Sequence, residues 1–243
     1  MDAFEIVVDI IGIIANICVL FLTGLTVYFT MFSKKIVVAS RGFSDSMFEG
    51  RTIELTIENK TLRTIPVSGI YFLYKIDDKW FSASPFNFDS PTLIGSKEIR
   101  KIKTKPFTSI SNIKDYSVFV QKSIIVVMSG NDYIWTGKNK NIKDLKKQFK
   151  NHEVENLTLI HSEYNGVVLS DNVKYIVSYR EIINGCYSFQ TVFVSKFGVL
   201  NKTIKGVNSL STNGEIDEKI ISDFLINYVK LAKNDFIIEK RFV

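Results

Sequence analysis

The sequence predicts a mainly β protein with α+β character, in which one N-terminal transmembrane helix precedes a β-sandwich and a small α+β domain. Three features support this: a long uncharged segment near the N-terminus, many short runs of alternating apolar and polar residues, and one amphipathic pattern near the C-terminus. The aromatic content of 13% favours strands, because aromatic side chains fit a pleated, half-buried surface. The predicted parts are a membrane anchor (residues 1–35), a β-sandwich domain (36–140), a basic linker or short helix (141–154) and an α+β domain with one helix on an antiparallel sheet (155–243).

The N-terminal segment from Ile10 to Phe32 contains no charged residue. A helix of this length rises about 34 Å at ~1.5 Å per residue, enough to cross a ~30 Å hydrocarbon core. Buried core helices are usually shorter. A cleaved signal peptide has a positive start and a small-residue cleavage site, whereas this segment follows Asp2, Glu5 and Asp9. We therefore expect a permanent single-pass anchor.

Basic residues lie only on the C-terminal side of this segment, at Lys34, Lys35 and Arg41. Because basic flanks stay on the cytoplasmic side, the sequence predicts an inner or plasma membrane protein with a short N-terminus outside and its other domains in the cytoplasm. The two cysteines, Cys18 and Cys186, offer no disulfide within the soluble part, which agrees with a reducing compartment.

Residues at alternating steps of three and four form one stripe along the predicted membrane helix, which is small or polar except at Val19: Gly12, Asn16, Thr23, Thr26 and Thr30. This spacing is that of a coiled-coil seam, and in lipid it permits close approach and hydrogen bonds between helices. The stripe predicts self-association or pairing with a second membrane protein. Two alternatives remain open: an accident of register, and several copies lining a polar path.

The first soluble domain contains short strand patterns separated by turn signals. Residues 52–58 (TIELTIE) alternate strictly, with Ile53, Leu55 and Ile57 on one face. Strands of similar pattern are expected over residues 36–39, 69–76, 98–104, 123–128 and 133–136. Short strands at this spacing predict a β-sandwich.

Residues 53–72 (IELTIENKTLRTIPVSGIYF) give a strand, a polar turn, Pro66 and a second strand. This pattern resembles immunoglobulin-like sandwiches at the level of the fold, and the chain resembles uncharacterised bacterial single-pass membrane proteins that carry such a domain behind the anchor. The resemblance implies a sandwich and no activity. It departs from antibody-type domains, because Trp80 and Trp135 have no bracketing cysteine pair.

A basic segment, KNKNIKDLKKQFK, lies between the two predicted domains. It is a solvated linker or a short helix with a weak apolar stripe of Ile142, Leu145 and Phe149. With the domains in the cytoplasm, its lysines are candidates for contact with anionic lipid: Lys138, Lys140, Lys143, Lys146, Lys147 and Lys150.

In the second domain, Asn165-Gly166 and Asn184-Gly185 predict two hairpins, because such pairs accept the positive φ angles of tight turns. Strands are expected over 173–182, 187–196, 199–204 and 236–243, and an amphipathic helix over 215–233. In this pattern Tyr175, Tyr179 and Tyr187 are core residues opposite Lys174 and Arg180, and Cys186 is a buried strand thiol.

No sequence signature of catalysis, phosphate binding or metal binding occurs, so the expectation is no enzyme, no cofactor and no metal. His152 and His161 are expected to be exposed. Nucleic acid is disfavoured, because tyrosine and basic residues alternate onto opposite faces. The leading hypothesis is a membrane-tethered binding or scaffold protein, oligomeric through its helix, with an unidentified soluble protein partner. The alternative is a membrane-perturbing effector of a bacterial defence or toxin-like system whose soluble domains sense a ligand. A hydrolase or nuclease without a motif is the third hypothesis.

Overall fold

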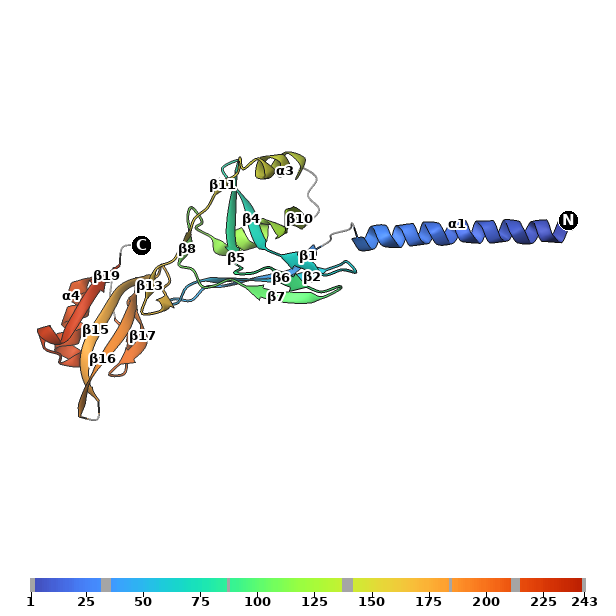
Figure 1. The fold of residues 1–243 in the computed structure, drawn as a ribbon. Helices are drawn as coiled ribbons and strands as arrows, with labels where there is room; N and C mark the ends of the chain where they lie inside the picture. Colours follow the sequence, from blue (N-terminus) through green and yellow to red (C-terminus); the bar gives the residue numbers. More distant parts are fainter. Residues whose placement is uncertain are drawn as a thin grey trace. The chain divides into compact units, whose positions relative to one another are not determined.

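The computed structural model describes residues 3–31, 36–86, 88–136, 142–183, 185–210 and 215–241. It is mainly β, with several sheets and one N-terminal apolar helix, α1 (Ala3–Met31) (Figure 1). Contacts divide the chain into two compact units. The first unit comprises Met1–Gly42, Ile53–Lys105 and Asp115–Asn156, and the second unit comprises Phe43–Thr52, Pro106–Lys114 and Leu157–Val243. Below, the name first unit is used for the residues of the first unit from Ile36 onward, without α1.

The first unit contains a five-stranded and a three-stranded sheet. The larger has the order β10 (Asp132–Thr136), β9 (Ile124–Ser129), β4 (Gly69–Ile76), β5 (Lys79–Phe86) and β11 (Glu155–Asn156), and the smaller joins β1 (Ile36–Ser44), β2 (Thr52–Asn59) and β7 (Ile99–Lys103). β3 (Ile65–Val67) pairs with β6 (Thr92–Ile94). Strands therefore form in every region of this domain where the alternation predicts one. β3, β5 and β6 were not predicted; β5 follows a tight turn in which Asp77 and Asp78 have φ angles of +44° and +67°.

The larger sheet buries residues on both faces, which explains why β9 reads as a continuous apolar run rather than an alternating one. On one face Phe72 stacks against Phe86 and against Phe119 of helix α2 (Tyr116–Lys122), with ring centroids 6.1 and 5.5 Å apart. Arg41 ends α2 by donating hydrogen bonds of 2.7–2.9 Å to the carbonyls of Val120, Gln121 and Ser123. Burial lowers the pKa of the Arg41 guanidinium.

The other face of this sheet is covered by α3 (Ile142–Lys150), which forms within the predicted basic linker. Leu145 and Phe149 of α3 are buried against Leu73, Ile124 and Val126 of the sheet. The segment is therefore the short helix among the two predicted alternatives. The side chain of Ile142, the third member of the predicted stripe, lies outside the described residues.

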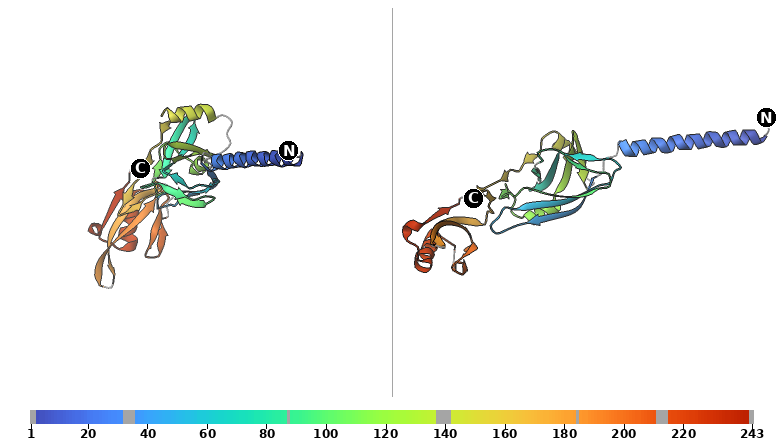
Figure 2. Two further views of the ribbon diagram at one scale, coloured as in Figure 1. Left: turned by 45° about the vertical axis from the view of Figure 1, so that its right-hand side comes forward. Right: turned by 60° about the horizontal axis from the view of Figure 1, so that its bottom comes forward.

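The second unit is built on an antiparallel sheet of five strands. Their order is β18 (Val207–Ser209), β17 (Val199–Ile204), β16 (Cys186–Ser195), β15 (Val173–Ile183) and β19 (Phe236–Lys240). β15 and β16 form a long hairpin, visible from several sides in Figures 1 and 2. Two small ladders complete the unit: β8 (Ser109–Ile110) with β12 (Leu159–Ile160), and β13 (Glu163–Tyr164) with β14 (Val167–Val168). The turn between β13 and β14 is the predicted Asn165-Gly166 pair, with φ angles of +48° and +81°.

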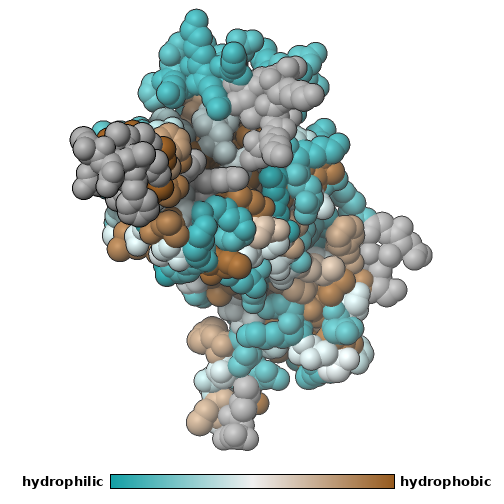
Figure 3. Space-filling view, turned by 90° about the vertical axis from the view of Figure 1, so that its right-hand side faces the viewer, coloured by the Kyte–Doolittle hydropathy of each residue, from teal (hydrophilic) through white to brown (hydrophobic). Residues whose placement is uncertain are grey.

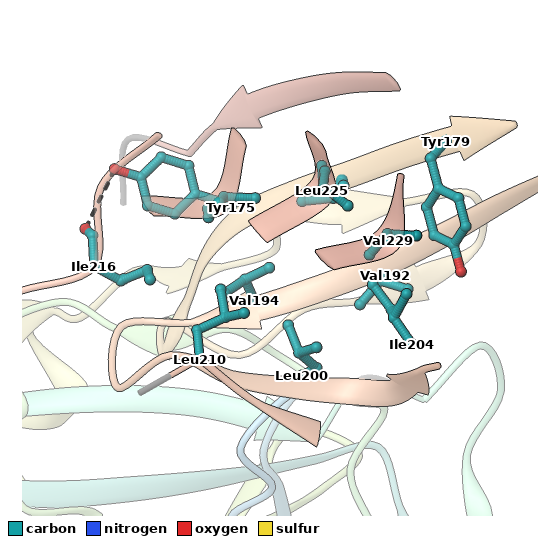
Figure 4. Packing of buried hydrophobic residues seen from close by; sticks show 12 residues of the cluster. Tyr175, Tyr179, Val192, Val194, Leu200, Ile204, Leu210, Ile216, Leu225 and Val229 are labelled. Carbon is teal, nitrogen blue, oxygen red and sulfur yellow. Dashed lines mark hydrogen bonds between the residues drawn. The ribbon is translucent and has the colours of Figure 1, made fainter. Parts of the chain in front are cut away.

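One face of this sheet is covered by α4 (Glu218–Asp223) and the π-helical turn η1 (Phe224–Val229) (Figure 4). Tyr175 points across this core, and its hydroxyl donates to the carbonyl of Ile216 at 3.5 Å. The helix predicted over residues 215–233 is shorter in the structure. Asp217 caps its start, and Lys230 ends it in a left-handed conformation, with a φ angle of +67°.

Two segments join the second unit from within the first predicted domain, residues 43–52 and 106–114. Arg51 and Phe107 exchange backbone hydrogen bonds of 2.7 and 3.0 Å, and the amide of Gly50 donates to the carbonyl of Val168 at 2.7 Å. A Cβ atom at Gly50 would lie 2.8 Å from Val168 Cγ1 and 3.0 Å from the Phe107 carbonyl oxygen, so only glycine fits. The units are therefore discontinuous in sequence, whereas the predicted domains were continuous.

The Arg51 side chain fixes this arrangement by contacts with three segments. It is 6% exposed, donates to the Thr108 carbonyl at 2.7 Å, and forms ion pairs with Asp171 at 2.8 Å and Asp45 at 3.1 Å. Arg241 donates to the Ser170 carbonyl at 2.9 Å. Burial lowers the pKa of its guanidinium, and the negative charge of Asp171 offsets part of this shift. Through Asp171, these charged groups connect residue 51 near the start of the second unit with residue 241 near its end.

We predict that Arg51→Met lowers the free energy of unfolding of the second unit by about 3–5 kcal/mol, because it leaves Asp171 partly buried without its closest cation. Hydrogen exchange of the β15–β16 amides in the full-length protein measures this loss. Glu215→Gln is the matched control, since the Glu215 carboxylate that pairs with Lys174 is exposed and the change should alter stability by less than about 0.5 kcal/mol. Equal effects of the two changes would contradict the role given to Arg51.

Candidate functional site

The second unit exposes apolar and aromatic side chains on the sheet face opposite the helix. We call Arg180, Ile182, Tyr187, Phe189 and Ile237 the hairpin face. The ladder sets Arg180 opposite Phe189 and Ile182 opposite Tyr187. Ile182, Ile237, Tyr187 and Phe189 are 62%, 64%, 71% and 76% exposed. Such side chains are rarely left in water together unless they contact a partner.

Arg180 is the only cation of the hairpin face. Its guanidinium carbon lies 5.4 Å from the ring centre of Tyr187 and 5.5 Å from that of Phe189, within the range of cation–π attraction. The carboxylate of Asp235 lies 4.0 Å away and is partly exposed. The guanidinium is thus held against two rings but remains open to an incoming carboxylate.

A groove of about 360 Å³ adjoins the hairpin face along β16. Phe193 and Thr191 belong to its lining and point to the same side of the sheet as Phe189. Tyr164 packs edge-to-face on Phe193, with centroids 6.1 Å apart, and Phe48 and Val167 contribute further apolar surface. The groove and the hairpin face together form one strip along β16, on the face of the sheet that points away from α4. We call this face the outer side of β16.

Two sequence predictions are wrong at the end of the hairpin. Cys186 was expected to be a buried thiol and Tyr187 a core residue, but both are exposed. Tyr175 and Tyr179 are buried as predicted, and burial, followed by the negative charge of Glu181, raises the pKa of Tyr179. Alternation identified the inner face correctly along β15. It gave the wrong result for Cys186 and Tyr187, which follow the turn at the end of the hairpin.

Helix α3 provides a second surface, and aromatic residues of the sheet hold this helix in place. The ring of Phe149 lies edge-on between Tyr133, Tyr71 and Trp135, with centroid distances of 5.1, 5.3 and 5.8 Å. Burial, followed by the neighbouring Tyr133, raises the pKa of Tyr71. Lys146 lies over the Trp135 ring at 5.5 Å. These contacts fix the rotation of α3 on the sheet.

The solvent side of α3 carries four of the six lysines predicted to contact anionic lipid: Lys143, Lys146, Lys147 and Lys150. All four are exposed, because Leu145 and Phe149 occupy the buried side. Lys138 and Lys140 lie outside the described residues. The top of the space-filling view, where α3 lies, is correspondingly hydrophilic (Figure 3).

Helix α1 is long and apolar enough to cross a membrane by length and composition: Ile11–Tyr28 has a mean hydropathy of 2.1 and is not buried by any other part of the described chain. Two hydroxyls of its polar stripe bond within the helix, Thr23 to the Val19 carbonyl at 2.7 Å and Thr26 to the Leu22 carbonyl at 2.8 Å. Gly12 and Asn16 are exposed, and the side chain of Thr30 lies outside the described residues. Asn16 is therefore the strongest candidate for a hydrogen bond between helices.

A polar cleft of about 610 Å³ lies beside Trp80 in the first unit, lined by Lys75, Lys79, Asp144, Glu153 and neighbouring residues. Its charges are of mixed sign. A hydrogen bond and the positive charge of Lys75 lower the pKa of Asp78, which makes that carboxyl a poor proton donor. His152 and His161 are exposed, as predicted. Among the described residues, no cluster of three His, Cys, Asp or Glu side chains suits a metal ion.

The sequence matches no protein family model and no curated protein. The geometry of these surfaces is therefore the basis for assigning a function.

We predict that Phe149→Ala lowers the free energy of unfolding of the first unit by about 3–5 kcal/mol, because it leaves a cavity among three aromatic rings. Both tryptophans, Trp80 and Trp135, pack in this cluster, so fluorescence during urea unfolding in detergent micelles measures the change. Lys150→Ala on the solvent side of the same helix should stay within about 0.5 kcal/mol of the parent. A similar small effect of Phe149→Ala would show that α3 is not held as described.

Proposed function

We propose that this chain is a non-enzymatic, membrane-tethered binding protein that recognises an extended apolar segment of another protein, carrying an acidic residue, along the outer side of β16. The observation that carries this proposal is the hairpin face, in which Arg180 contacts two exposed aromatic rings. Tyrosine and arginine are enriched among the residues that dominate the energy of protein interfaces. The adjoining groove supplies apolar surface for the rest of the segment.

In this proposal α1 anchors the protein in an inner or plasma membrane, with a short N-terminus outside and both units in the cytoplasm. The basic residues that follow α1 support this orientation. The first unit is an immunoglobulin-like sandwich, an assignment supported by its antiparallel sheets and opposed by the parallel pairing of β11 with β5. The second unit is the α+β domain, with α4 and η1 on its sheet.

A photoreactive phenylalanine analogue at Phe189 tests the binding surface in native membranes. We predict a discrete crosslinked adduct from this position and none from Lys219, an exposed control position on α4. Arg180→Glu should reduce the adduct at least tenfold, because it sets an anion against the acidic residue of the partner segment. An adduct that persists in Arg180→Glu would contradict the acidic partner, and equal crosslinking from both positions would contradict the binding surface.

The proposal also includes self-association through the polar stripe of α1, with Asn16 at the contact. In a chain with Cys18→Ser and Cys186→Ser, we expect oxidation of membranes to give disulfide dimers with Asn16→Cys and several-fold fewer with Ile14→Cys. Ile14 lies on the opposite, apolar side of the helix, because residues two apart differ by about 200°. Equal yields would mean that α1 only anchors the chain.

Overexpression separates this function from that of a membrane-perturbing effector. A tethered binding protein should leave the membrane potential of the host intact. Growth arrest with loss of membrane potential, abolished by Asn16→Leu, would replace the proposal with the effector.

A further inference from the structure

Three observations indicate what the lysine side of α3 contacts. They are its charge, the aromatic residues that hold the helix on the sheet, and the length of chain between α1 and the first unit. Lys143, Lys147 and Lys150 are exposed, and Lys146 is exposed while also contacting the Trp135 ring. Within α3 they are opposed by a single acid, Asp144. A surface of this charge complements anionic phosphate groups, and lysine binds these as a point charge without demanding a fixed geometry.

The aromatic mounting makes this surface rigid. Because Phe149 is enclosed by Tyr71, Tyr133 and Trp135, the helix cannot rotate to turn its lysines toward the sheet. The four cations therefore keep one direction relative to the first unit. A solvated linker would not restrict them in this way.

The chain length between α1 and the first unit keeps that unit close to any membrane that α1 crosses. α1 ends at Met31 and β1 begins at Ile36. The chain from Met31 to Ile36 spans at most about 18 Å even when it is fully extended. The tether limits how far the first unit can lie from the bilayer, but it does not determine which face of the unit points toward the lipid. A weak electrostatic preference is therefore enough to select that face.

We infer that α3 docks flat on the anionic surface of the membrane that holds α1, and so fixes which side of the first unit faces the lipid. This inference rests on the proposed membrane anchoring of α1 and goes beyond the proposed binding of a protein segment. The attraction acts only at close range, because the Debye length is about 8 Å at physiological ionic strength. Each lysine near an anionic surface strengthens the docking by roughly fivefold.

The test uses full-length protein with Cys18→Ser, Cys186→Ser and a fluorescent label on Gln148→Cys, an exposed position on α3. It is reconstituted into vesicles of phosphatidylcholine alone or of phosphatidylcholine with phosphatidylglycerol, each containing a lipid with a quencher on its headgroup. We expect several-fold stronger quenching in the anionic vesicles, and weaker quenching at high salt. Equal quenching in the two lipids would overturn the inference.

A matched pair of variants separates the lysine side of α3 from net charge. Lys143→Gln with Lys147→Gln and Lys150→Gln should reduce quenching in anionic vesicles to the level in phosphatidylcholine, while the contact of Lys146 with Trp135 is kept. Changing Lys101, Lys103 and Lys122 to Gln removes the same charge elsewhere on the first unit and should leave quenching unchanged. Equal losses in the two triple variants would overturn the inference.

Flotation distinguishes failure of the anchor from failure of the docking. If the protein does not float with phosphatidylcholine vesicles, or is released from them by alkaline carbonate, α1 is no anchor and the membrane proposal fails with the inference. If it floats and resists carbonate but its label is quenched equally in both lipids, only the docking of α3 is overturned.

Discussion

The second unit depends on one buried guanidinium. Arg51 reaches the Thr108 carbonyl and the carboxylates of Asp45 and Asp171, so it joins parts of the chain that are more than one hundred residues apart. Burying a charge is costly unless its partners remain in place, and the breaking of such a group is more destabilising than its formation is stabilising. Residues 43–52 and 106–114 belong to the second unit, although in the sequence they lie between segments of the first.

Alternation in the sequence predicted most strands, because a sheet with one buried face needs apolar residues at every second position. It located the inner face of β15 and the strand β2, whose Ile53, Leu55 and Ile57 are fully buried. The crossing of chain segments between units could not be predicted in this way. It depends on a few backbone hydrogen bonds at Gly50 and Arg51, which need no apolar period and leave only a single glycine as a signal.

For a similar reason, the sequence predicted the lysine surface of α3 but not the hairpin face. The lysines of α3 stand out in the sequence, and Leu145 and Phe149 already suggested which side of a helix would be buried. The hairpin face gave no such signal, since Tyr187 and Phe189 continue the strand pattern that marks a core. Their exposure follows from tertiary packing: α4 and η1 cover one side of the sheet, whereas these rings project from the other. Pairing Arg180 with Phe189 across the predicted turn would have been the only route to the patch.

Both surfaces consist of side chains on elements that several contacts hold in place. The hairpin face is set by a continuous ladder from Tyr175 to Cys186, and α3 is set by the rings around Phe149. A rigid mounting lowers the entropy lost on binding, so a small patch can bind usefully. The proposed membrane tether would add to this effect, because it would confine encounters to one surface and raise the local concentration of partners there. Under the proposed anchoring and binding, weak individual contacts, such as those of exposed lysines or of a single arginine against two rings, are then sufficient.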